Sequence, residues 1–231
     1  MKRKNKSDAY DMTTARQSKI RKIEGKKLIV VLEDCSLESD KVGNNYVILS
    51  SDKHRQFLLK QHKDPMKYRP DILHQCLLTL LDSPLNRAGL LQVYFRTNKN
   101  VLVEVNPQCR IPRTFDRFCG LMVQLLAKRK VRASDSSAVL LKVIKNPIMM
   151  HMPVGIKTYL TSFNTDLLIR PRELVKNDEN EPILVVVGGI ATGKVTTDYT
   201  EKDIKISSYP LSAALTCAKL THEIEEVWGI F

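Results

Sequence analysis

The sequence predicts an α/β fold with a largely parallel sheet flanked by helices. Continuous apolar runs of strand length recur along the chain, and such runs are typical of strands covered on both faces. Helical patterns lie between the runs, and this alternation indicates an α/β protein. Residues 98–100, Asn-Lys-Asn, separate two of the runs and predict a hairpin turn, hence one antiparallel piece. The predicted strands are 28–32, 46–49, 90–95, 101–105, 139–144 and 183–187.

Three helices are predicted from apolar spacing and end signals. The first begins at Pro70 and Asp71, with a proline in the first turn and a carboxylate where the helix dipole favours it, and it stops before Pro84. The second runs from Thr114, and the last runs from about Pro210 to Trp228. Both carry apolar residues at intervals of three and four, as a helix packed on a sheet requires.

Length and composition indicate one globular domain. The chain has 231 residues, of which 43% are hydrophobic and 27% are charged. The sequence contains no run of about 20 apolar residues, the length that a membrane span requires, and its first residues lack the apolar core of a signal peptide. We therefore expect a single domain over 28–231, no membrane association, and a cytosolic or nuclear protein.

A strongly basic segment precedes this domain. Residues 1–27 carry ten basic side chains against three acidic ones and almost no large apolar ones, which predicts a disordered basic arm. Such an arm can serve as a nuclear address, as a phosphate tether or simply as a solubilising tail. The whole chain carries a formal net charge of +12, a balance that favours a polyanionic partner.

The cysteines and histidines form no metal-binding pattern. Five cysteines are spread along the chain with no CxxC pair, and the five histidines form no spaced pair. We therefore expect neither disulfides nor a metal site.

A glycine-rich turn is the strongest site signal. The strand at 183–187 runs directly into Gly188-Gly189-Ile190-Ala191-Thr192-Gly193-Lys194, and glycines at the end of a strand let a ligand approach the backbone closely. The turn nearly matches a phosphate-binding P-loop, with Lys194 as its lysine. Val195 stands where that motif needs a hydroxyl for magnesium, so a nucleotide hydrolase is the weaker interpretation.

Two further features carry charge. From Arg96 to Arg132 there are nine basic residues against two acidic ones, and Arg110, Arg113 and Arg117 gather where a loop meets the second helix. Arginine forks match phosphate oxygens, so this segment predicts a phosphate track, with a solvated helix face as the alternative. Arg69 and Asp71 flank Pro70 at the start of the first helix, where a salt bridge is the simpler interpretation.

Several strings together resemble one family, the eukaryotic small-subunit ribosomal RNA methyltransferases that act on the ring N1 of a pseudouridine and also serve in ribosome assembly. The resemblance covers residues 28–231. The strings are LIVVLE at 28–33, SLE at 36–38, RPDI at 69–72, HQ at 74–75, DSPLN at 82–86, EVNP at 104–107, RIPRTF at 110–115, GLMVQLL at 120–126, KVIKNP at 142–147 and YPLSA at 209–213.

The resemblance implies the SPOUT class of methyltransferases, in which the C-terminal part of the chain threads through a loop to form a trefoil knot. It implies that S-adenosylmethionine binds in the knot and that two subunits pair there as a homodimer. The RNA contacts it implies are Arg69, Arg110, Arg113 and Arg117. The cofactor residues carried over by position are Thr161, Gly188, Gly193, Lys194, Val195, Ile206, Ser207, Ser208, Tyr209, Pro210 and Leu211.

The resemblance also implies roles in catalysis and in the cell. N1 of pseudouridine carries a proton that must leave, and Asp71 beside Arg69 is the candidate acceptor; the alternative is that Asp71 only holds Arg69 and the helix start. The implied partners are small-subunit ribosomal RNA and preribosomal assembly proteins, in the nucleolus or nucleus. A second function class stays open, a non-catalytic RNA-binding assembly factor or chaperone, because it needs the same RNA surface.

Overall fold

A computed structural model of the chain describes residue 23 and residues 25–231. Most of the predicted basic arm lies outside the described residues, so the arm stays a prediction. The last residues before 28 belong to the folded domain: β1 (Lys27–Cys35) begins one residue earlier than predicted, with Lys27 opposite Pro182. The Lys26 ammonium lies 5.3 Å from the centre of the Trp228 ring, which joins the start of β1 to the C-terminal helix.

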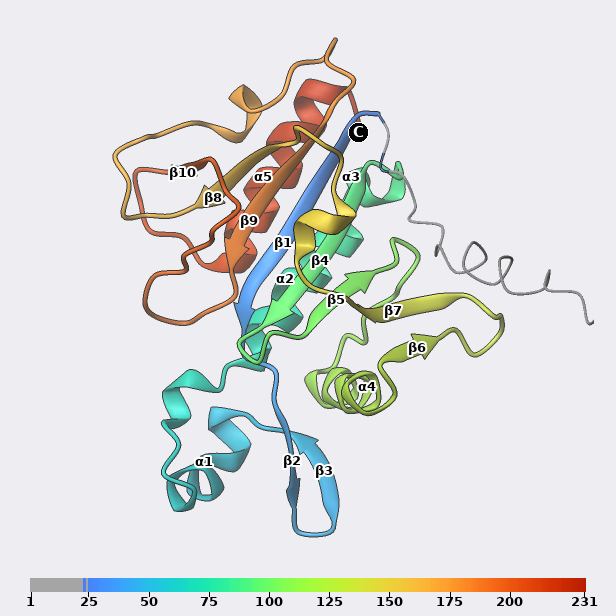
Figure 1. The fold of residues 1–231 in the computed structure, drawn as a ribbon, viewed down its shortest axis with the longest axis vertical. Helices are drawn as coiled ribbons and strands as arrows, with labels where there is room; N and C mark the ends of the chain where they lie inside the picture. Colours follow the sequence, from blue (N-terminus) through green and yellow to red (C-terminus); the bar gives the residue numbers. More distant parts are fainter. Residues whose placement is uncertain (1–22, 24) are drawn as a thin grey trace, which may run out of the picture.

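One eight-stranded sheet organises the molecule, with strand order β10-β8-β9-β1-β4-β5-β7-β6 (Figure 1). The pairs from β10 to β4 are parallel, and those from β4 to β6 are antiparallel. The predicted hairpin at 98–100 is confirmed. Besides β1, the strands of this sheet are β4 (Leu91–Thr97), β5 (Leu102–Val105), β6 (Lys130–Arg132), β7 (Val139–Ile144), β8 (Lys157–Thr161), β9 (Pro182–Gly188) and β10 (Lys202–Ile204).

Most of the α-helices cover one face of the sheet, short turns and loops cover the other, and the first helix lies below the sheet beside a separate hairpin (Figure 1). No helix of the described part is long and apolar enough to cross a membrane. The α-helices are α1 (Ser51–Lys60), α2 (Pro70–Asp82), α3 (Pro84–Arg87), α4 (Phe115–Lys128) and α5 (Ala213–Trp228). The 3-10 helices are η1 (Pro65–Lys67), η2 (Ile148–His151) and η3 (Pro171–Glu173).

Strand β1 is apolar on both sides because it lies between two cores. Leu28, Val30 and Leu32 belong to the larger core beneath the helices. Ile29 and Val31 belong to a smaller core on the other face, which η2 and the loop after β9 complete. Burial on both faces explains the continuous apolar run in the sequence.

Three predicted elements differ from the observed ones. The strand predicted at 46–49 is β3 (Asn45–Ile48), which pairs with β2 (Ser39–Val42) in a separate hairpin below the sheet, because Gly43 and Asn44 make a tight turn (Figure 1). The last helix begins at Ala213 instead of about Pro210, since the Ser212 hydroxyl accepts a hydrogen bond from the Leu215 amide and caps it there.

The third difference concerns the arginines. Helix α4 begins at Phe115 instead of Thr114, because Thr114 has an extended backbone, so Arg113 lies in the preceding loop and Arg117 lies on the helix.

A late segment of the chain runs between two earlier ones. Residues 202–204 pair with β8, and on their other side the Lys205 amide donates to the Leu167 carbonyl while the Lys205 carbonyl accepts from the Ile169 amide. The excursion between β8 and β9 therefore encloses the segment that leads into α5. This is the threading on which the predicted knot depends.

Candidate active site

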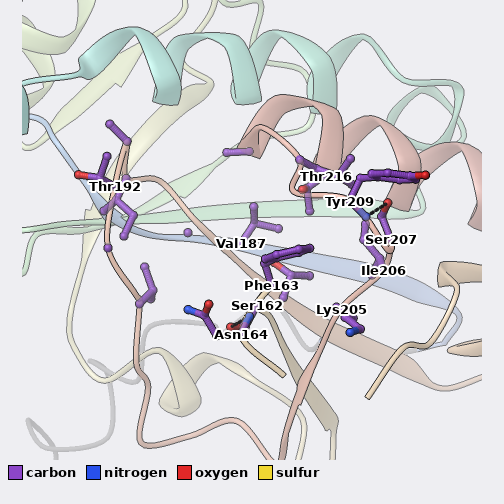
Figure 2. Close-up of a pocket in the computed structure, with 18 residues that line it drawn as sticks. Ser162, Phe163, Asn164, Val187, Thr192, Lys205, Ile206, Ser207, Tyr209 and Thr216 are labelled. Carbon is purple, nitrogen blue, oxygen red and sulfur yellow. Dashed lines mark hydrogen bonds between the residues drawn. The ribbon is translucent and has the colours of Figure 1, made fainter. Parts of the chain in front are cut away.

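A cavity of about 280 Å³ lies at the carboxyl ends of β8 and β9, closed by the segment after β10 and the start of α5 (Figure 2). Carboxyl ends of parallel strands are where α/β sheets bind ligands. The wall combines apolar side chains with hydroxyls and exposed backbone. Its residues are Thr161, Ser162, Phe163, Asn164, Val187, Gly188, Ile190, Ala191, Thr192, Gly193, Val195, Lys205, Ile206, Ser207, Tyr209, Leu211, Ala213 and Thr216.

Two positions of the glycine turn require glycine for structural reasons. A Cβ at Gly189 would lie 2.5 Å from the Cys35 sulfur, and the Gly189 amide donates to the Glu33 carbonyl at 2.6 Å. Gly193 has φ +107, a conformation that other residues adopt only with strain. The turn therefore packs directly on the end of β1 and leaves its backbone facing the cavity.

A buried carboxylate fastens the loop that follows the turn. Glu33 is 2% exposed, accepts from Arg96 Nε at 2.7 Å and accepts from the Tyr199 hydroxyl. Burial and the Glu33 carboxylate raise the pKa of Tyr199 above its ordinary value. This network joins three elements, the ends of β1 and β4 and the loop after β9, and so holds one wall of the cavity.

Most of the predicted cofactor residues meet in this cavity. Lys194, Ser208 and Pro210 are outside its lining: the Lys194 ammonium lies 3.7 Å from Asp203, and Ser208 and Pro210 are exposed. The predicted residues that line it are Thr161, Gly188, Gly193, Val195, Ile206, Ser207, Tyr209 and Leu211.

Sequence reasoning missed part of the lining. Ser162, Phe163 and Asn164 follow β8, a strand whose mixed sequence gave no apolar run, and Phe163 points across the cavity beside Val187 (Figure 2). Thr216 lies on the first turn of α5. The one available signal was position, since residues after a strand at this edge of the sheet share a site.

A second cavity of about 320 Å³ adjoins the first. The two share the turn residues 190–193 as a common wall. Three cationic side chains line the second cavity, Lys67, Arg69 and Lys194. Its remaining lining is Asp34, Ser36, Met66, Asn98 and Gly189.

Arg69 and Asp71 form a two-pronged ion pair. Arg69 Nε and Nη2 donate to the two Asp71 oxygens at 2.9 and 2.7 Å, and the Arg69 amide donates to Ser36. The hydrogen bonds that Arg69 donates to the Asp71 carboxylate raise the pKa of Arg69. Arg69 lines the second cavity but Asp71 does not, so the geometry favours the structural interpretation of Asp71 over a role as proton acceptor.

The other three predicted RNA contacts lie on a neighbouring segment. Arg110, Arg113 and Arg117 are exposed, and Arg113 pairs with Asp82 at the end of α2. His74 Nε2 lies 2.7 Å from the Pro112 carbonyl, so the loop with Arg110 and Arg113 packs against the helix that Arg69 begins. The four arginines therefore belong to adjoining segments, and of the four only Arg69 lines one of the two cavities described above.

The P-loop interpretation does not fit the structure. A P-loop places its lysine at the start of a helix whose amides bind phosphate. Residues 189–201 form no helix, and the chain continues into β10.

The fold and the site define a knotted α/β protein with a ligand cavity in its threaded loops, the arrangement of SPOUT methyltransferases. Residues 30–225 match the model of the EMG1/NEP1 methyltransferase family, and the chain belongs to this family. The resemblance drawn from the sequence is confirmed, and so is the predicted fold class.

Several named proteins are similar in sequence to this chain along almost its whole length. The Caenorhabditis elegans ribosomal RNA small subunit methyltransferase nep-1 is 62% identical over 209 residues, which are 90% of each chain. The human protein named ribosomal RNA small subunit methyltransferase NEP1 is 63% identical over 209 residues, 90% of this chain and 85% of its own. The crystal structure of Archaeoglobus fulgidus Nep1 bound to S-adenosylhomocysteine has the same fold, with a TM-score of 0.65 at 23% identity, covering 89% of this chain and 99% of that one.

Proposed function

We propose that the protein transfers a methyl group from S-adenosylmethionine to N1 of a pseudouridine in small-subunit ribosomal RNA, as part of small-subunit biogenesis. The family match over residues 30–225 carries this proposal. The names of the worm and human relatives supply the substrate class, and the archaeal homologue was crystallised with the demethylated product of the same cofactor.

The residues of the first cavity suit this cofactor. S-adenosylmethionine, when bound, supplies a methyl group on a positively charged sulfur. The side chains of Val187, Ile190 and Leu211 offer apolar surface for a purine ring, and Ser207 and Thr216 offer hydroxyls at the cavity wall. No carboxylate lines this cavity among the described residues, so the exposed backbone of the glycine turn carries much of the polar recognition.

The second cavity suits the target nucleotide. It shares a wall with the cofactor cavity, and its cations Lys67, Arg69 and Lys194 favour a phosphate-bearing ligand. A base inside a structured RNA must turn out of its stack to reach such a cavity, and an unpaired loop makes this less costly. Arg110, Arg113 and Arg117 then bind the phosphates that flank the target.

We also propose that the protein acts as a homodimer paired near the knot. Large apolar side chains stand exposed around the cofactor cavity: Phe163 is 52% exposed, Tyr209 77% and Leu215 48%. Near the start of the last helix, Leu211 and Ala214 pack partly on the chain's own core, whereas Leu215 stays exposed and can meet a partner.

Preribosomal proteins as partners, and the nucleolus or nucleus as the place of action, belong to the same proposal. A net charge of +12 supports residence among ribosomal RNA. The alternative of an assembly factor without turnover shares every RNA contact named above, so only a measurement of methyl transfer separates the two.

The test is transfer of a labelled methyl group from S-adenosylmethionine to a synthetic small-subunit RNA loop that contains pseudouridine. We expect label in the pseudouridine loop and none in the matched uridine loop. Binding of both loops without any transfer would favour the non-catalytic assembly factor and contradict the proposal.

A further inference from the structure

Transfer to N1 requires a group that takes the N1 proton, and the two cavities offer few choices. Among the described residues that line them, Asp34 is the one carboxylate, and none is a histidine. The lysines and Arg69 there offer hydrogen-bond donors and no acceptor, and Tyr209 lines only the first cavity.

A bulge at the end of β1 directs Asp34 outward. Opposite β4, Leu32 pairs with Phe95 and Cys35 pairs with Thr97, so β1 contains one extra residue between these pairs. Asp34 has φ 58 and is exposed, whereas Glu33 and Cys35 on either side of it are buried. Bulges of this kind re-aim a side chain and are common beside active sites. Asp34 therefore leaves the sheet at the wall of the second cavity.

The neighbouring carboxylates are already engaged. Glu33 accepts hydrogen bonds from Arg96 and Tyr199, and both oxygens of Asp71 accept from Arg69. Asp34 makes no ion pair with any described residue. Its oxygens are free for a ligand that enters the cavity.

We propose that Asp34 is the catalytic residue that accepts the N1 proton of the target pseudouridine. This inference rests on the proposed function. As the N1–methyl bond forms and the sulfur–methyl bond breaks, the N1–H bond gives its proton to the Asp34 carboxylate. The products are N1-methylpseudouridine, the neutral thioether and a protonated Asp34, which then releases its proton to water.

The same contact gives specificity. Pseudouridine has an N–H group where uridine has a C–H group, because its sugar is attached through carbon. A carboxylate at this position accepts a charge-assisted hydrogen bond from the first base and none from the second. Asp34 therefore distinguishes the two bases even when no cofactor is bound.

Two substitutions separate recognition from proton transfer. Asp34→Gly removes the side chain and keeps the positive φ without strain, whereas Asp34→Asn keeps an accepting oxygen but cannot take a proton. Asp135→Asn, in the exposed turn between β6 and β7, is the matched control. Binding of pseudouridine and uridine versions of one RNA loop is measured by fluorescence anisotropy without cofactor, and methyl transfer is measured at saturating RNA.

The wild-type protein and Asp135→Asn should prefer the pseudouridine loop by about tenfold, the effect of one hydrogen bond to a charged group. Asp34→Gly should lose that preference, and Asp34→Asn should keep part of it. Both Asp34 variants should lose about a hundredfold or more in transfer rate. Thermal melting identifies a variant that fails to fold. If one Asp34 variant fails to fold, the base preference and transfer rate of the other variant test the role of Asp34.

Three results would overturn the assignment: no preference in the wild-type protein, a preference that survives Asp34→Gly, or wild-type transfer rates in a folded Asp34 variant. A wild-type protein that methylates neither loop would instead contradict the proposed function itself.

Discussion

Tyr199 attaches the loop after β9 to the end of β1 through a hydrogen bond to Glu33. Its hydroxyl donates to a buried carboxylate that also accepts from Arg96, so removing it leaves Glu33, which is 2% exposed, short of one partner. We predict that Tyr199→Phe lowers the free energy of unfolding by about 1–3 kcal/mol, measured by urea denaturation. Tyr46→Phe is the control, because Tyr46 is 66% exposed and should change stability by less than about 0.5 kcal/mol.

The same residue predicts a dependence on pH. Its pKa is raised in the folded protein, so above the ordinary tyrosine value of 10.0 the unfolded chain loses this proton while the folded chain keeps it. The stabilisation is complete below pH 10 and is lost as the pH rises further. Stability should therefore decline less steeply above pH 10 in Tyr199→Phe than in the wild-type protein. Equal slopes would mean that Tyr199 is not protonated preferentially in the folded state.

At the scale of elements, the contact between the glycine turn and the end of β1 sets the shape of both cavities. In Gly189→Ala the new Cβ would meet the Cys35 sulfur at 2.5 Å and the Glu33 carbonyl at 3.1 Å, so the turn must move. We predict a loss of about 1–3 kcal/mol in unfolding free energy. We also predict loss of the rise in melting temperature that S-adenosylhomocysteine gives the wild-type protein, about 2.7 kcal/mol of stabilisation at a hundredfold excess over Kd.

The matched control is Gly120→Ala within α4. A Cβ there meets nothing within 4 Å, and alanine favours a helix over glycine by about 0.5–1 kcal/mol, so this variant should be slightly more stable and should bind the ligand normally. If Gly189→Ala behaves like Gly120→Ala, the turn does not depend on its contact with β1.

The elements that sequence predicted are those with strong local signals. Strands β1 and β9 are continuous apolar runs because both faces are buried, and α2 has a proline and a carboxylate in its first turn. β8 and β10 were missed because they are short and polar on one side. Threading is a relation between distant segments that no local sequence pattern encodes. The knot could therefore be predicted only from the resemblance to the family.

The site residues also differ in whether a local sequence signal predicts them. The glycine turn was evident from its sequence, and the arginines from their density. Asp34 was not singled out, because its exposure depends on a bulge that adds one residue to β1 relative to β4. Asp71 is a candidate proton acceptor from its position beside Arg69, with a structural role as the simpler interpretation, and the observed ion pair between the two favours the structural role.

At the scale of the whole molecule, RNA binding and cofactor binding should be separable. Arg69, Arg110, Arg113 and Arg117 each contribute about 0.7 to the slope of log affinity against log salt if each binds a phosphate of an unpaired loop. Alanine at all four should flatten that slope by about 3, measured by filter binding over a salt series. Cofactor affinity should stay unchanged, since none of the four lines the first cavity. An unchanged slope would place the RNA elsewhere on the protein.

The oligomeric state is a second property of the whole molecule. Leu215 is 48% exposed on the first turn of α5, beside the cofactor cavity, and a charge buried there would oppose pairing. We predict a dimer for the wild-type protein and a monomer for Leu215→Glu by light scattering at micromolar concentrations. His222→Glu, at an exposed position further along α5, is the control and should remain a dimer. A monomeric wild-type protein would contradict the proposed pairing.

The identity of the methylated nucleoside tests the proposed methyl transfer to N1 of pseudouridine. RNA loops incubated with the protein and S-adenosylmethionine are digested to nucleosides, and the product is separated and identified by mass spectrometry against synthetic standards. We expect N1-methylpseudouridine from the pseudouridine loop and unmodified nucleosides from the uridine loop. A methyl group on N3, on the ribose or on another base would contradict the proposed transfer.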